Sequence, residues 1–112
     1  YFAGFSRAAE IGALLRAVDE IEAGPDVAQR AAEAWMVGDL RPEVEEVRRL
    51  SRVYPDYYQA ILVARNRRWA PRFRAMLDGG GTTFVLVGGD HLVGPDSVQN
   101  QLAAAGMRAR RL

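Results

Sequence analysis

His91 is the only histidine in this 112-residue sequence, and its side chain titrates closest to neutral pH. It ends the run Gly88–His91, directly after an apolar run, residues 82–87, that is rich in β-branched and aromatic residues and has glycines on both sides. Such a run predicts a buried strand. Gly94 and Pro95 then predict the start of a helix. His91 is therefore expected on a strand-to-helix loop, where open α/β sheets bind ligands.

The chemistry expected of His91 is that of a metal ligand or a general acid–base group. The alternative is a loop histidine that caps the following helix or bonds to backbone. Gly88 and Gly89 would let the backbone approach whatever the imidazole holds. Asp90 is either a ligand or an orienting carboxylate for His91, or a residue that stabilises the turn.

A second set of candidate residues lies on a predicted helix, residues 56–77. Asn66 interrupts the apolar stripe of this helix, so its amide must either bond to backbone or face a polar cavity. Arg65 borders the stripe, and its guanidinium could bind a carboxylate or a developing oxyanion in a pocket, or pair with a glutamate of another helix. Pro71 predicts a kink or break over residues 67–71.

The elements that must position these residues are predicted from periodicity. Three amphipathic helices are predicted to form a helical layer over residues 1–55. They run over residues 5–23, from the cap Asp26 to the stop at Gly38, and over residues 42–53. Residues 56–112 form a helix-strand-helix-strand unit, with its second helix at residues 95–105, a stop at Gly106 and a last strand at residues 107–112. The predicted fold class is α/β, mostly helical with a small parallel strand-helix-strand unit at the C-terminus. Because two strands make a poor sheet, we expect the chain to be the C-terminal half of a larger α/β domain, completed by an N-terminal half or by a second copy of the chain.

Composition limits the classes of function. The length fits one domain or part of one, and nearly half of the residues are hydrophobic. A formal net charge of +1 gives no general attraction to nucleic acid, and the absence of cysteine excludes disulfides and thiolate metal sites. No apolar run is long enough for a transmembrane segment. The chain opens at Tyr1 without a methionine, so we expect it to be a segment of a longer protein.

The sequence resembles the C-terminal portion of the TraB/GumN family. The similarity rests on Arg65-Asn66-Arg67-Arg68-Trp69-Ala70, on the strand-like run that ends in Gly88-Gly89-Asp90-His91 and continues to Gly94-Pro95-Asp96, and on Gly106-Met107. The run Ala34-Trp35-Met36-Val37-Gly38-Asp39-Leu40 is also similar, and the likeness extends from about Ala34 onward.

This resemblance implies membership of a superfamily of TraB, GumN, Tiki peptidases, haem-binding ChaN-type proteins and erythromycin esterases. Its members share an α/β fold with two Gly-x-x-His motifs, an acidic residue and an arginine around one pocket. Carried over to this chain, His91 ends the second motif, as a catalytic residue and metal ligand, and Arg65 is the catalytic arginine. Asn66, Gly88, Gly89 and Asp90 would line the pocket.

The function that the resemblance implies is a metal-dependent, peptidase-like hydrolase using Mn, Co or Zn, with a peptide or small-molecule substrate. The first motif would lie in the N-terminal half, so these residues alone would be inactive. The alternative is a non-catalytic module that binds haem or another ligand. The resemblance also implies a location in the bacterial cell envelope or periplasm.

Overall fold

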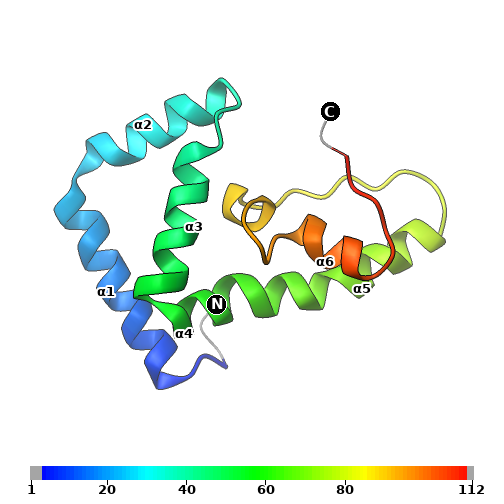
Figure 1. Ribbon diagram of the computed structural model, residues 1–112, viewed down its shortest axis with the longest axis horizontal. Coiled ribbons are helices and arrows are strands. Elements are labelled where there is room, and N and C mark those ends of the chain that lie inside the picture. The colour runs from blue at the N-terminus through cyan, green and yellow to red at the C-terminus, as the bar shows by residue number, and fades with distance from the viewer. Residues whose placement is uncertain (1–3, 111–112) are drawn as a thin grey trace.

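The computed structural model describes residues 4–110, and the regular structure in that range is entirely helical (Figure 1). The helices are α1 (Arg7–Ala23), α2 (Pro25–Met36), α3 (Arg41–Val53), α4 (Pro55–Tyr58), the π-helical η1 (Gln59–Val63), α5 (Ala64–Asp78), the 3₁₀ helix η2 (Gly89–Leu92) and α6 (Val98–Ala104). Figure 1 shows α1, α2 and α3 as three sides of an open frame that stands on the α4–α5 rod, while η2 and α6 lie along that rod.

Local sequence explains how α1 begins and where it meets the rod. The Ser6 side chain accepts a hydrogen bond from the Ala9 N–H and caps the first turn. Gly24, with φ of +78°, ends α1. Gly12 is buried, and a Cβ added there would lie 3.0 Å from the Cβ of Tyr57. The absence of a side chain at Gly12 therefore lets α1 approach α4 closely.

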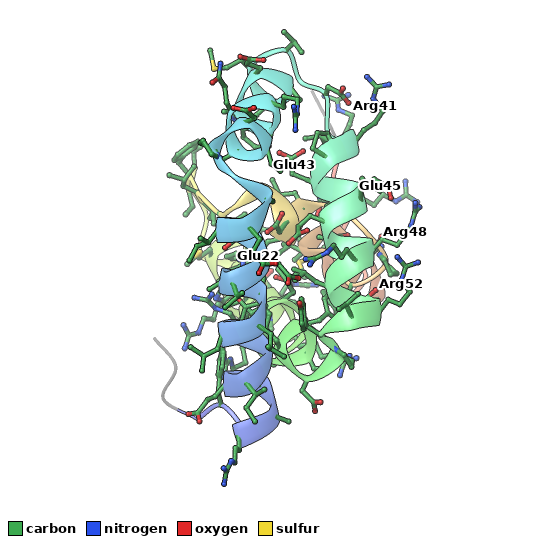
Figure 2. The ribbon with its side chains drawn as sticks, turned by 90° about the vertical axis from the view of Figure 1, so that its left-hand side faces the viewer. Glu22, Arg41, Glu43, Glu45, Arg48 and Arg52 are labelled. Carbon is green, nitrogen blue, oxygen red and sulfur yellow. The ribbon has the colours of Figure 1, made fainter. Side chains whose placement is uncertain are left out.

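The helix α3 is amphipathic and supplies part of the core. Arg41, Glu45, Arg48 and Arg52 point outward from it, while Glu43 lies on the inner side toward α2 (Figure 2). Its buried residues Val47 and Leu50 join apolar side chains of the rod and of the segment after η2. The members of this core are Val47, Leu50, Tyr57, Tyr58, Ile61, Leu62, Val63 and Val93. Packing of α3 against the rod thus forms the hydrophobic centre of the described chain.

The rod itself runs without a gap from Pro55 to Asp78, through α4, η1 and α5. Of the kink or break predicted over residues 67–71, the break does not occur, because α5 continues as α-helix through Pro71. Proline removes one N–H donor there, but the neighbouring hydrogen bonds hold the helix on both sides. The irregular turn lies instead at Gln59–Val63, where the wider π turn brings both Leu62 and Val63 into the core.

The predicted strand at residues 82–87 is not part of a sheet. The backbone of residues 82–88 has no helix or strand assignment, and no strand occurs within residues 4–110. Phe84 and Leu86 are 87% and 85% exposed, whereas Val85 is 43% exposed and Val87 is half-buried. The α/β prediction is therefore wrong for the described chain: the side chains alternate as in a strand, but a sheet also needs neighbours that these residues do not supply.

For the C-terminal part of the chain, the predicted end of the last helix is confirmed, whereas its predicted start and the predicted last strand are wrong. The helix α6 begins at Val98 rather than at Pro95, because the preceding turn closes with a hydrogen bond from the Ser97 N–H to the Gly94 carbonyl (3.3 Å). Gly106, with φ of +77°, ends α6 as predicted. Residues 107–110 form no strand, and residues 111 and 112 of the predicted strand lie outside the described range.

The frame leaves much apolar surface uncovered. The surface area is 8085 Å², whereas a compact monomer of this mass exposes about 6100 Å². The helix α2 has no buried residue, and the large apolar side chains of α1 are 47% to 79% exposed. These α1 residues are Ile11, Leu14, Leu15, Val18 and Ile21. The chain is also flat, with extents of 46 × 36 × 21 Å. Its shape is thus that of an open layer rather than of a closed globule.

Candidate functional site

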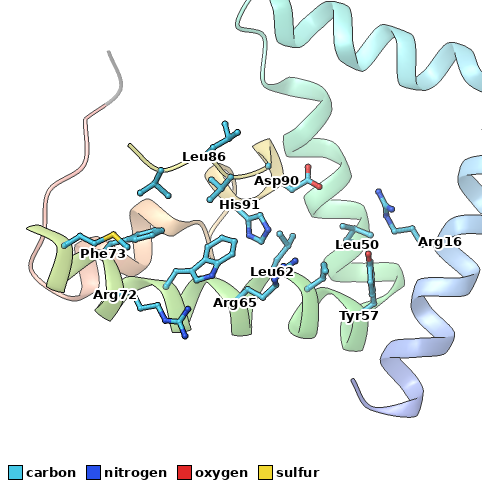
Figure 3. A pocket seen from close by; sticks show the side chains of 16 residues that line it. Arg16, Leu50, Tyr57, Leu62, Arg65, Arg72, Phe73, Leu86, Asp90 and His91 are labelled. Carbon is cyan, nitrogen blue, oxygen red and sulfur yellow. The ribbon is translucent and has the colours of Figure 1, made fainter. Parts of the chain in front are cut away.

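A groove of about 690 Å³ lies between the rod, η2 and residues 85–88 (Figure 3). We call it the histidine groove. Apolar and aromatic side chains form most of its wall, and arginines and one carboxylate lie among them. The apolar members are Leu50, Tyr57, Ile61, Leu62, Trp69, Phe73, Met76, Val85, Leu86 and Val87. The polar members are Arg16, Arg65, Arg72, Asp90 and His91. Grooves of this size with a few polar groups are typical of ligand sites.

His91 lies on the single turn of η2 and faces the rod. Its N–H donates to the Gly88 carbonyl at 3.0 Å, which closes the turn, and the residue is 9% exposed. The imidazole packs against the Trp69 ring, with 4.6 Å between ring centroids, and its Nδ1 lies 2.7 Å from Oδ1 of Asn66. The imidazole is therefore held by a side chain of α5 and is not a cap of the following helix.

Asn66 connects the histidine to the turn before α6. It is 1% exposed, and its Nδ2 donates to the Asp96 carbonyl at 2.8 Å. Tyr58 in turn donates its hydroxyl hydrogen to the Asp96 carboxylate at 2.7 Å. The amide at position 66 thus bonds to backbone, which is one of the two alternatives expected for it, whereas Asn66 is not among the residues that line the groove.

Tyr58 and Asp96 also belong to this network, although neither was predicted as a site residue. Tyr58 lies on the apolar stripe of the rod, one turn before Leu62 and two turns before Asn66. Its hydroxyl, a polar group on that stripe, was the one feature of the sequence that could have indicated this role. Burial and the neighbouring Asp96 carboxylate raise the pKa of the Tyr58 phenol, so the hydroxyl keeps its proton and acts as the donor.

Arg65 lies in the same groove, one residue before Asn66. Its guanidinium carbon is 5.6 Å from the centre of the Trp69 ring, a cation–π distance. Burial of the imidazole, and next the positive charge of Arg65, lower the pKa of His91. A guanidinium and an imidazole thus both lie next to one indole ring.

Asp90 faces away from its neighbour His91. Figure 3 shows the carboxylate directed toward the end of the groove where Arg16 lies, while the imidazole is directed toward the rod. Burial raises the pKa of Asp90, the Arg16 charge opposes this, and Glu46, Glu43 and Glu20 add to it. Asp90 does not orient the imidazole in this structure, since Asn66 occupies that position.

The two glycines of the motif have different surroundings. A Cβ added to Gly88 would meet the Cδ2 of His91 at 3.9 Å, an ordinary contact, and Gly88 lines the groove. A Cβ added to Gly89 would lie 2.9 Å from the Trp35 ring and 3.2 Å from Cγ of Glu43. Gly89 thus makes room for α2 and α3, a packing role that differs from the backbone approach to a ligand expected for it.

The sequence matches the model of the TraB/PrgY/gumN family over residues 1–111. The chain belongs to this family.

The TraB/PrgY/gumN match covers nearly the whole chain, including α1, which lies before the region from about Ala34 where the resemblance was expected. No curated protein and no solved structure matches the chain. Family membership was thus predicted correctly from the motifs around Asn66 and His91, whereas the roles of individual residues stay predictions.

Within residues 4–110, none of the helices is both long and apolar enough to cross a membrane.

Proposed function

We propose that this TraB/PrgY/gumN chain forms one wall of a hydrolytic site for an amide or peptide bond, with His91 and Arg65 as its reacting groups. The observation that carries the proposal is that the two side chains line one groove while Asn66 engages Nδ1 of His91. Nε2 is then the ring nitrogen left to bind a ligand or to move a proton. Arg65 would stabilise negative charge on a substrate carbonyl.

A divalent cation fits this wall only in part. A metal-ligating imidazole commonly donates its other N–H to an acceptor, and the contact of Nδ1 of His91 with Oδ1 of Asn66 is compatible with this arrangement. However, residues 4–110 contain no group of three or more His, Cys, Asp or Glu side chains that could hold a metal. A Mn, Co or Zn ion would therefore need ligands in addition to His91, and we assign no reaction step to a metal.

The test is hydrolysis of a panel of peptides and esters by the complete gene product, with and without added Mn, Co or Zn. His91→Ala should lower the rate by about 10² to 10⁴. Arg65→Ala should lower it by about 10² to 10³. The matched control is Arg68→Ala, an exposed arginine of the same helix, which should leave the rate unchanged. Absence of hydrolysis across the panel, or full activity of His91→Ala, would overturn the proposal.

The apolar wall favours one second function, a non-catalytic module that binds haem or another flat apolar ligand beside Trp69 and Phe73. A haem titration followed by absorbance separates the two functions. A Soret shift that disappears in His91→Ala, together with no hydrolysis, supports the binding module.

A further inference from the structure

The amide of Asn66 has one possible orientation in this structure. Its neighbour on one side is the backbone carbonyl of Asp96, which can only accept a hydrogen bond. The nitrogen Nδ2 must therefore face Asp96, and the oxygen Oδ1 must face His91. An amide oxygen also only accepts, so the hydrogen of this 2.7 Å contact belongs to Nδ1 of His91.

We propose that Asn66 is a positioning residue that holds His91 in the tautomer with hydrogen on Nδ1 and a lone pair on Nε2. The inference rests on the proposed function only for the use of this tautomer: a metal ligand or a general base requires a lone pair on Nε2. Its physical content is independent of any activity, since it concerns one proton on one ring.

The supports of Asn66 explain why the amide keeps this orientation. The residue is 1% exposed, so water cannot replace its partners. The carbonyl that it contacts belongs to a turn held by Tyr58, which donates to the Asp96 side chain. Asn100 holds the same turn from outside, with its Nδ2 3.1 Å from the Gly94 carbonyl and 3.0 Å from the Pro95 carbonyl. A flipped amide would place two acceptors against each other at Asp96.

The test is a long-range ¹H–¹⁵N spectrum of the ¹⁵N-histidine-labelled chain, at a pH where the ring is neutral. Because His91 is the only histidine, the spectrum contains one imidazole. We expect a pyrrole-like Nδ1 and a pyridine-like Nε2. A pyridine-like Nδ1 in the unmodified chain would overturn the proposal, and this measurement needs no variant that folds.

Two variants show whether Asn66 sets the tautomer. Asn66→Ala removes the acceptor, so hydrogen on Nε2 should become populated and the two nitrogen shifts should converge. The matched control Gln29→Ala removes an exposed amide of α2 that bonds to Glu33 and not to this turn, and should leave both shifts unchanged. An unchanged spectrum in Asn66→Ala, or an equal change in Gln29→Ala, would show that Asn66 does not set the tautomer.

The same variants separate this inference from the proposed function. If hydrolysis is found, Asn66→Ala should lower kcat by about 10- to 100-fold with little change in KM, because a positioning residue does not touch the substrate. Hydrolysis together with hydrogen on Nε2 in the unmodified chain would overturn the inference and leave the function standing. The Nδ1–H tautomer together with no hydrolysis would support the inference and overturn the proposed function.

Discussion

At the scale of single residues, the network from Tyr58 through Asp96 and Asn66 to His91 is the most constrained part of the chain. The Tyr58 hydroxyl and the Asn66 amide nitrogen are clear donors to Asp96, and the contact between Asn66 and His91 is buried. A buried polar group that loses its partner costs about 1–3 kcal/mol, so the members of such a network stabilise one another. The network links the rod to η2 and to the turn before α6.

The first prediction concerns the outer end of this network. Tyr58→Phe removes the donor to Asp96 and should lower the free energy of unfolding by about 0.5–1.5 kcal/mol. Urea denaturation of Tyr58→Phe, Asp96→Ala and the double variant measures the coupling between the two side chains. Strictly additive losses would show that the hydroxyl and the carboxylate do not interact in solution.

The second prediction is a pH dependence of stability. The folded pKa of His91 lies below its ordinary value of 6.5, because burial and then Arg65 disfavour the imidazolium. The unfolded chain therefore takes up the proton first as the pH falls below 6.5. The contribution of His91 to stability is complete above that pH and is lost toward the folded pKa, at no more than about 1.4 kcal/mol per pH unit.

Urea denaturation at about pH 7.5 and about pH 5.5, with a chelator present, measures this dependence. His91→Gln cannot titrate, so its stability should fall less between the two pH values than that of the unmodified chain. Equal slopes for the two proteins would contradict the lowered pKa.

At the scale of elements, the sequence predicts helices well where periodicity and caps agree. The predicted stop at Gly24 and the predicted helix at residues 42–53 match α1 and α3 closely, because Gly24 and the spacing of Val47 and Leu50 act locally. The strand at residues 82–87 was wrong, since pairing depends on a neighbour that no local pattern supplies. The π turn at η1 carried no sequence signal.

The third prediction compares two adjacent glycines. Gly89→Ala should cost about 1–3 kcal/mol, because the new methyl group would lie 2.9 Å from Trp35 of α2. Gly88→Ala has an allowed φ of −63° and would make only an ordinary contact with His91 at 3.9 Å, so it should change stability by less than about 0.5 kcal/mol. Thermal unfolding of the two variants checks the difference. Equal losses would mean that η2 does not pack against α2 in solution.

At the scale of the whole molecule, the uncovered surface is the dominant feature. The excess over a compact monomer is about 2000 Å², which is the size of a protein–protein interface. Residues 82–87 add a length of irregular backbone outside any helix or sheet of residues 4–110, and unpaired edges of this kind associate readily.

The fourth prediction follows from this surface. The chain of residues 1–112 should associate with further copies as its concentration rises, through pairing of the irregular segment. Light scattering over a roughly hundredfold range of concentration measures this association. Phe84→Glu and Leu86→Glu should reduce it, whereas Leu14→Glu on the exposed face of α1 is the matched control. A monomer throughout the range, or a larger effect of Leu14→Glu, would contradict pairing through residues 82–88.

The sequence by itself determined the family and most of the helices, and its resemblance to that family gave the hypothesis that Asn66 and His91 lie around one pocket. These follow from motifs, caps and the 3.6-residue period, all of which act within a few turns of chain. Only the tertiary structure decided that His91 contacts Asn66, that Asp90 faces away from it and that Tyr58 and Asp96 complete the network. Those contacts join residues 25 to 38 positions apart, so they depend on how the rod packs against η2 and the turn before α6. For the same reason the strand could not be predicted correctly, because a sheet is decided by what lies beside a segment and not by the segment itself.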